Sequence, residues 1–145
     1  MDKPFAYLLV VCQFTSIGWL MQSAYPFHLN IIGLILSTFA VVLVAWSLWV
    51  MRISKIRILP MPHLEAQLIT SGPYRFLRHP MYTAVLIFTA GISITNFQWI
   101  NLLFWVLLLL VLLIKLHWEE RMLIKRFPQY QYYQQHSYKL IPFIY

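Results

Sequence analysis

Residues 29–51 read LNIIGLILSTFAVVLVAWSLWVM and contain no charged side chain. An α-helix needs roughly 20 predominantly apolar residues to cross the roughly 30 Å of hydrocarbon in a bilayer, and this run is longer than that. Inside the hydrocarbon every backbone polar group must be satisfied within the protein, which favours a helix for a single apolar run. We therefore predict that residues 29–51 span a membrane as one α-helix.

Three further apolar segments accompany this one. Residues 5–21 are just long enough to cross and lack the small-residue cleavage site of a signal peptide, and residues 99–118 are of full length. Residues 81–95 are short, so we expect them to lie in a thinned or water-filled region or to lean on neighbouring helices. The predicted fold is all-α, a polytopic membrane helical bundle of about four transmembrane helices with an amphipathic C-terminal tail.

The composition of the whole chain agrees with a membrane protein. Of its 145 residues 61% are hydrophobic and 10% are charged, which excludes an ordinary soluble domain. The net charge of +7 does not indicate a nucleic-acid partner, because the basic residues lie between apolar runs, where they meet lipid headgroups. Cys12 is the single cysteine, so neither an intramolecular disulfide nor a thiolate zinc site is expected, and no other metal site is predicted.

The positions of the basic residues orient the bundle. No Lys or Arg lies in residues 22–29 or 96–98. The eleven that exist are Lys3, Arg52, Lys55, Arg57, Arg75, Arg78, Lys115, Arg121, Lys125, Arg126 and Lys139. Because short loops rich in Lys and Arg stay in the cytoplasm, both termini and most of the polar residues are predicted to be cytoplasmic, which requires an even number of spans.

The densest polar stretch on that side is LITSGPYRFLRHPMY, residues 68–82. Gly72-Pro73 predicts a turn. Pro80 predicts a helix start, since its fixed φ and missing N–H suit the first helical turn. The N-terminus of that helix, next to Arg78, attracts anionic groups.

A pair of carboxylates, Glu119 and Glu120, follows the fourth segment on the same side. Lys115 lies one turn before Glu119 and shares its helix face, so a cationic rim with one inward carboxylate is predicted to bind a zwitterionic, partly cationic ligand. A plainer interpretation stays open. The Arg-His-Pro string also fits a positive-inside anchor with a helix start, and the Glu-Glu-Arg run also fits a solvated helix end.

The order and spacing of these residues form a longer pattern in two parts. The first part, Leu-x-Thr-x-Gly-x-Tyr-x-x-x-Arg-His-Pro-x-Tyr, comprises Leu68, Thr70, Gly72, Tyr74, Arg78, His79, Pro80 and Tyr82. The second part comprises Glu119, Glu120, Leu123, Phe127, Tyr130, Tyr133, Pro142 and Phe143. The pattern covers residues 64–143, a little over half of the chain, and resembles the isoprenylcysteine carboxyl methyltransferase family of membrane enzymes.

The resemblance implies a membrane methyltransferase that holds S-adenosylmethionine at the cytoplasmic ends of the last helices. The implied cofactor-binding residues are Gln67, Leu68, Ile69, Tyr74, His79, Pro80, Met81, Tyr82, Glu119 and Glu120. Lys115, at the position of the family's substrate-orienting Arg, and Arg78 are the predicted catalytic residues. On this interpretation residues 1–145 form one membrane domain, with two N-terminal spans in 1–51 and the cofactor-binding core in 52–145.

Two departures from the family pattern concern the methyl acceptor. Ala66 stands where the prenylcysteine enzymes have a His, and Lys115 keeps the charge of the family's Arg but loses its bidentate grip on a carboxylate. The expected acceptor is a lipophilic small molecule or lipid that enters from the bilayer. Transfer of an already activated sulfonium methyl needs positioning and exclusion of water more than acid–base residues.

Three alternatives remain at this point. One is N-methylation of a phospholipid headgroup, and another is a membrane protein without enzymatic activity whose motif is structural. The third comes from membrane sterol reductases, which carry a similar His-Pro-x-Tyr string and use a nicotinamide cofactor.

Overall fold

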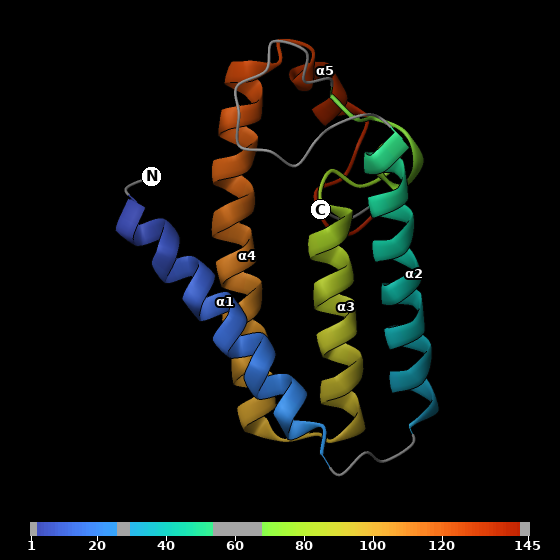
Figure 1. Cartoon of the computed structure of the whole chain (residues 1–145), viewed down its shortest axis with the longest axis vertical. Helices are drawn as coiled ribbons and strands as arrows, with labels where there is room; N and C mark the ends of the chain where they lie inside the picture. Colours follow the sequence, from blue (N-terminus) through green and yellow to red (C-terminus); the bar gives the residue numbers. More distant parts are fainter. Residues whose placement is uncertain (1–2, 26–29, 54–67, 143–145) are drawn as a thin grey trace.

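The computed structural model describes residues 3–25, 30–53 and 68–142 (Figure 1). Its elements follow the order α1 (Lys3–Ser23), α2 (Ile31–Ile53), η1 (Gly72–Arg75), α3 (Pro80–Thr95), α4 (Trp99–Arg126) and α5 (Tyr130–Gln135). Within these ranges the only pairing of β type is one isolated bridge, so the predicted all-α helical bundle is confirmed.

The four apolar segments appear as helices close to their predicted bounds. α1, α2 and α4 are long and apolar enough to cross a membrane. α3 is apolar but has 16 residues, about 24 Å at 1.5 Å per residue. It lies between α2 and α4 (Figure 1), so the short segment does lean on its neighbours. The chain is therefore a multi-pass membrane protein.

α4 is longer than its apolar segment. The sequence pattern predicts an end at residue 118, whereas the helix continues to Arg126. Residues 119–126 contain neither Gly nor Pro, and Lys125 and Arg126 in the last turn interact favourably with the helix dipole. At 28 residues α4 is about 42 Å long, so its last turns extend past the hydrocarbon and carry the two carboxylates.

α2 and α3 pack closely through small residues. A Cβ atom built on Gly33 would lie 2.7 Å from the carbonyl oxygen of Gly91, and one built on Gly91 would lie 2.9 Å from the carbonyl oxygen of Gly33. Ala40 and Ala84 are buried further along the same interface. Small residues allow membrane helices to approach in this way, because backbones then contact directly.

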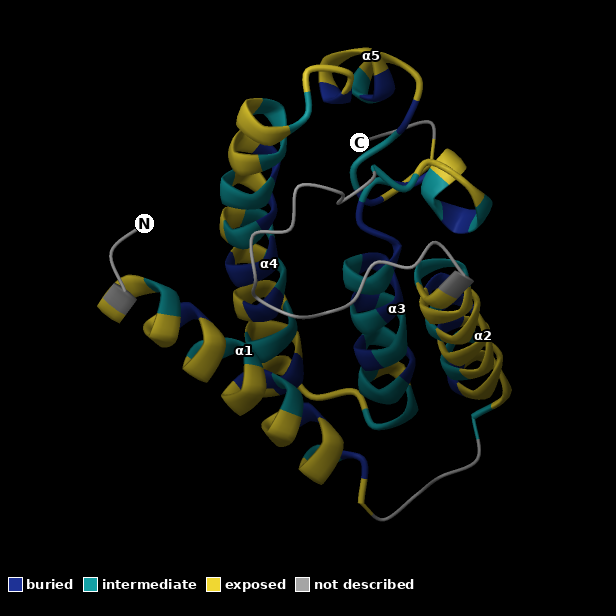
Figure 2. Ribbon diagram, turned by 45° about the horizontal axis from the view of Figure 1, so that its top comes forward, coloured by how far each residue is buried: buried dark blue, intermediate teal, exposed yellow. Residues whose placement is uncertain are grey.

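α1 crosses α4 obliquely, and the face of α1 that points away from α4 is not covered by another helix (Figure 1). Leucines fill the interface of α4 with α1 and α3, and they include Leu20, Leu86, Leu108, Leu112 and Leu116. Figure 2 shows exposed residues along the outer faces of α1 and α2. Many of them are large and apolar, such as Phe14 and Trp49, as a lipid solvent requires.

Candidate active site

The candidate site is built around the first turn of α3. His79 precedes the helix and Pro80 is its first residue, as the sequence predicts. The predicted turn at Gly72-Pro73 is the 3-10 helix η1. Gly72 has φ of 61°, a value that favours glycine, and a Cβ atom there would lie 2.6 Å from the side chain of Val50. The turn is thereby held against α2.

The C-terminal segment runs beside residues 76–79 and orders them. Leu77 and Tyr138 form a parallel bridge. The backbone N–H of Arg78 donates to the carbonyl of Tyr138 at 2.7 Å, and the N–H of Tyr138 donates to the carbonyl of Phe76 at 2.9 Å. The Thr83 hydroxyl on α3 also donates to the carbonyl of residue 140, at 2.7 Å. The tail is therefore part of the framework of the site.

The tail has the predicted amphipathic character, but its buried side covers the protein. Tyr130 and Tyr133 are buried, whereas Tyr132 is 70% exposed. The Tyr133 hydroxyl donates to the carbonyl of Tyr74, and it lies 3.5 Å from the carbonyl of Leu77. Burial raises the pKa of Tyr133 to about 12, and burial also raises the pKa of Tyr130 above its usual value. Both phenols therefore remain protonated at neutral pH.

Tyr82 of α3 and Glu119 of α4 meet directly. The Tyr82 hydroxyl donates to Glu119 Oε1 at 2.5 Å, in the range of strong charge-assisted hydrogen bonds. The His79 ring stacks on the Tyr82 ring, with centroids 5.5 Å apart and planes 13° apart, and His79 Nδ1 lies 3.6 Å from Glu119 Oε2. The two parts of the sequence pattern thus converge at one end of the bundle.

Glu120 points into the interior, toward Arg78. Both side chains are 8% exposed, and Arg78 Nε lies 2.9 Å from Glu120 Oε1. Arg78 Nη1 also donates to the carbonyl of Gln134 at 3.0 Å. By contrast the Glu119 side chain is 39% exposed. The two adjacent carboxylates share His79, whose Nε2 lies 3.6 Å from Glu120 Oε1, but they differ in their other partners and in their access to solvent.

Lys115 lies one turn before Glu119 and contacts two other helices. Its Nζ donates to Gln13 Oε1 of α1 at 2.7 Å. The same Nζ lies 5.6 Å from the centroid of the Tyr82 ring, within the range of a cation–π interaction. Lys115 thereby joins α1 to the pair of Tyr82 and Glu119.

Gln13 also belongs to this site, although the sequence motif does not indicate it. It lies far from the motif, in the first apolar segment. The spacing of residues along α1 is the one feature that could have indicated it. Leu9, Ser16 and Leu20 are buried, and Gln13 lies four residues after Leu9 and three before Ser16, so it shares their face of the helix.

The remaining predicted site residues surround this cluster. Leu68 and Ile69 are half-buried just before η1, and Met81 is half-buried in the first turn of α3. Tyr74 is half-buried, and burial raises the pKa of its phenol. Gln67 lies outside the described residues. Among the side chains that the structure describes, no three His, Cys, Asp or Glu residues are placed to hold a metal ion.

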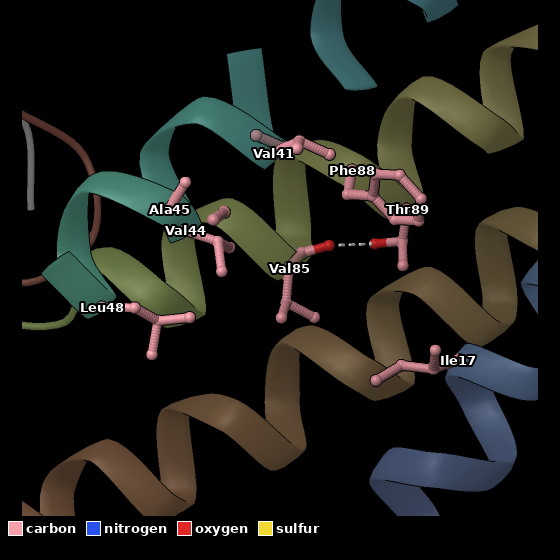
Figure 3. A pocket seen from close by; sticks show the side chains of 10 residues that line it. Ile17, Val41, Val44, Ala45, Leu48, Val85, Phe88 and Thr89 are labelled. Carbon is pink, nitrogen blue, oxygen red and sulfur yellow. Dashed lines mark hydrogen bonds between the residues drawn. The ribbon is translucent and has the colours of Figure 1, made fainter. Parts of the chain in front are cut away.

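An apolar cavity of about 410 Å³ opens further into the bundle (Figure 3). It begins at Ala84 and Val85, next to the turn of α3 that carries Tyr82. Phe88 and Thr89 of α3, residues of α2 and Ile17 of α1 complete its lining. Thr89 carries the one hydroxyl in the lining, and that hydroxyl donates to the Val85 carbonyl at 2.8 Å. The cavity therefore suits a hydrocarbon group.

The bundle carries a cluster of Tyr, His, Glu and Lys at one end, and an apolar cavity lies beside this cluster. These features define a class of membrane protein that is able to bind a polar group and a lipophilic group next to each other. Residues 29–130 match the model of the family described as Phospholipid methyltransferase. The chain belongs to this family of membrane methyltransferases, and the resemblance inferred from the motif is confirmed. No curated protein and no solved structure matches the chain significantly.

Proposed function

We propose that the protein transfers the methyl group of S-adenosylmethionine to a lipophilic acceptor at the cytoplasmic face of the membrane. The observation that carries the proposal is the hydrogen bond between Tyr82 and Glu119, which joins the two parts of the motif. The apolar cavity begins on the next turn of α3. A polar cofactor and a lipophilic acceptor then approach one another from opposite sides of this turn.

The side chains at this end fit the polar parts of S-adenosylmethionine. Glu119 accepts from Tyr82 through one oxygen and is partly exposed, so it is able to accept from ribose hydroxyls or from the ammonium group. His79 is buried, and its two ring nitrogens each lie 3.6 Å from a carboxylate, Nδ1 from Glu119 and Nε2 from Glu120, so its ring is held beside the exposed Glu119. The N-terminus of α3 carries a partial positive charge that suits the methionine carboxylate.

When bound, S-adenosylmethionine supplies a methyl group on sulfonium, whose S–C bond breaks as the bond to the acceptor's oxygen or nitrogen forms, leaving a neutral thioether. The residues of the chain supply position and charge. The carboxylate of Glu119 and the face of the Tyr82 ring favour a cation beside them. A carboxylate acceptor loses no proton, whereas an ammonium acceptor must lose one, and Glu119 is the partly exposed carboxylate beside Tyr82 that is able to take it.

The two predicted catalytic cations receive different proposed roles. Lys115 is held by a neutral amide, so its charge remains available to orient the acceptor. Arg78 is committed to Glu120 and to the Gln134 carbonyl. We assign Arg78 a positioning role at the start of α3 in place of a direct catalytic one.

The charge distribution supports a cytoplasmic site. Arg52 lies in the last turn of α2, Arg75 lies in η1, and Lys125 and Arg126 lie in the last turn of α4. These residues belong to the end of the bundle that carries Tyr82 and Glu119, and short basic segments stay in the cytoplasm. We further propose that the chain is one membrane domain, in which residues 52–145 form the cofactor-binding core behind two N-terminal spans.

N-methylation of a phospholipid headgroup is the second candidate, because the family that the chain matches is described as Phospholipid methyltransferase. Membrane lipids incubated with methyl-labelled cofactor and the purified protein separate the two candidates. A methyl ester releases labelled methanol on treatment with base, whereas an N-methyl group does not.

Binding of labelled S-adenosylmethionine to the detergent-purified protein tests the proposal itself. We expect Glu119→Gln to weaken binding at least tenfold, since it removes the charge and the strong acceptor. Lys125→Gln is the control, because Lys125 is exposed on the same helix away from the cluster. Absence of binding in the unmodified protein, or equal binding in the folded Glu119→Gln variant, would overturn the proposal.

A further inference from the structure

Lys115 places a charge within the packed helices, where a partner is needed. Lys115 is half-buried between α1 and α3, one turn short of the two carboxylates. A cation at such a position is costly without a partner. The partner that the structure provides is the Gln13 carbonyl oxygen, at 2.7 Å.

The choice of an amide as partner has a physical consequence. A carboxylate at position 13 would neutralise the ammonium group, whereas an amide satisfies one N–H and leaves the positive charge in place. Hydrogen bonds between two charged groups are stronger than those between a charged and a neutral group. An anion that reaches Lys115 therefore replaces the Gln13 amide with a net gain.

The surroundings of Gln13 indicate what the rest of such an anion looks like. Ile17 lies one turn after Gln13 on the same face of α1, and Ile17 lines the apolar cavity. Lys115 and the cavity are thus neighbours along α1, and the charge lies on the side of Tyr82, since Lys115 Nζ is 5.6 Å from the centroid of that ring. A molecule with an anionic head and a hydrocarbon tail matches this order.

We propose that Gln13 is a positioning residue that makes the acceptor site selective for amphiphiles bearing a carboxylate or phosphate. In the free protein its amide holds Lys115 against the Tyr82 ring. In the complex the anionic group of the acceptor takes the place of the amide, and the hydrocarbon tail lies in the cavity. The inference rests on the proposed function, and it assigns a part of the site to α1, which lies outside the matched residues 29–130.

The test measures binding rather than turnover. The probes are oleate, oleyl phosphate and oleyl alcohol, which share one chain and differ in the head, and each is titrated into the full-length protein in detergent. We expect oleate, oleyl phosphate or both to bind at least tenfold more tightly than the alcohol. The two anionic probes distinguish a carboxylate from a phosphate as the preferred head.

Gln13→Glu is the decisive variant, because it is isosteric and leaves Lys115 with a partner. We expect it to abolish the preference for anionic heads, so that oleate and oleyl phosphate bind no more tightly than oleyl alcohol. Gln22→Glu is the matched control, the same change at an exposed position near the C-terminal end of α1, and it should keep the preference.

Equal binding of all three probes to the unmodified protein would overturn the inference, and so would an unchanged preference in folded Gln13→Glu. Loss of affinity for all probes alike in that variant would also overturn it, because a structural defect does not discriminate between heads. Failure of the proposed function would appear separately, as absent cofactor binding in the unmodified protein.

Discussion

On α4, Glu119 and Glu120 point in directions about 100° apart, because successive residues of an α-helix turn by that angle. Glu119 meets Tyr82 and is partly exposed, while Glu120 meets Arg78 and is buried. Their proposed tasks differ accordingly. The exposed carboxylate faces ligand, and the buried one fixes the cation that precedes α3.

The buried pair of Arg78 and Glu120 gives a prediction for stability. Arg78→Met should lower the free energy of unfolding by roughly 3 kcal/mol, since it removes the nearest cation from a buried carboxylate and leaves it only the more distant His79. Arg78→Met combined with Glu120→Leu should recover most of that loss, because both charges are then absent. Thermal unfolding in detergent measures both, and a double variant no more stable than the single one would contradict the assignment.

The sequence predicts this residue-level arrangement only in part. The motif brings Tyr82 and the two carboxylates to the same side of the membrane, and the direct contact confirms that they converge. Which carboxylate turns inward depends on the rotation of α4 about its axis. That rotation is set by leucine packing over several turns, and no local pattern reports it.

At the level of elements, the starts of helices are better predicted than their ends. Pro80 fixes the start of α3 through its own geometry. The end of α4 has no such signal, because residues 119–126 are charged yet good helix formers. The pairing of the tail with residues 76–79 is also hidden from the sequence, since one short parallel bridge has no periodicity.

The close contact of α2 with α3 predicts a contrast between two glycines. Gly91→Ala should destabilise the protein by about 1–3 kcal/mol, because the added methyl meets the backbone carbonyl oxygen of Gly33 at 2.9 Å and the Ser37 hydroxyl oxygen at 3.0 Å, both on α2. Gly18→Ala should be neutral, or stabilising by up to about 1 kcal/mol, since nothing lies within 4 Å of its Cβ position and Ala is the better helix former. Melting temperatures of the two variants provide the measurement, and equal shifts would argue against the packing.

The two buried tyrosines of α5 predict a second contrast. Tyr133→Phe should cost about 0.5–1.5 kcal/mol, because the hydroxyl donates to the Tyr74 carbonyl. Tyr130→Phe should be neutral or stabilising, since its buried hydroxyl has no hydrogen-bond partner in the described part of the chain. Unfolding in denaturant compares the two, and an equal cost would mean that the Tyr130 hydroxyl has a partner in solution.

For the whole molecule, the testable property is its orientation in the membrane. Starting from Cys12→Ser, single cysteines at Phe97 and Met122 lie exposed at opposite ends of the bundle. A membrane-impermeant maleimide should label Phe97→Cys in intact cells and should label Met122→Cys only after permeabilisation. The reverse pattern would place the site outside and contradict the positive-inside argument.

Global architecture is the part of this protein that the sequence predicts most completely. The length of each apolar run and its lack of charged residues define the helices, because a segment crosses a bilayer when it is apolar, long enough and helical. The contribution of α1 to the site is the exception. Gln13 reaches Lys115 because α1 crosses α4 at a slant, and a crossing angle depends on how two surfaces interlock rather than on either segment alone.

The bonds from the tail to Arg78 and Thr83 impose an order on biosynthesis. Residues 138–140 leave the ribosome after α1, α2, α3 and α4 have been made, so the bundle inserts before its active end closes. Insertion and maturation are then separate events. A polypeptide released after α4 would enter the bilayer with its helices intact, but it would lack the tail that orders the start of α3 and completes the site.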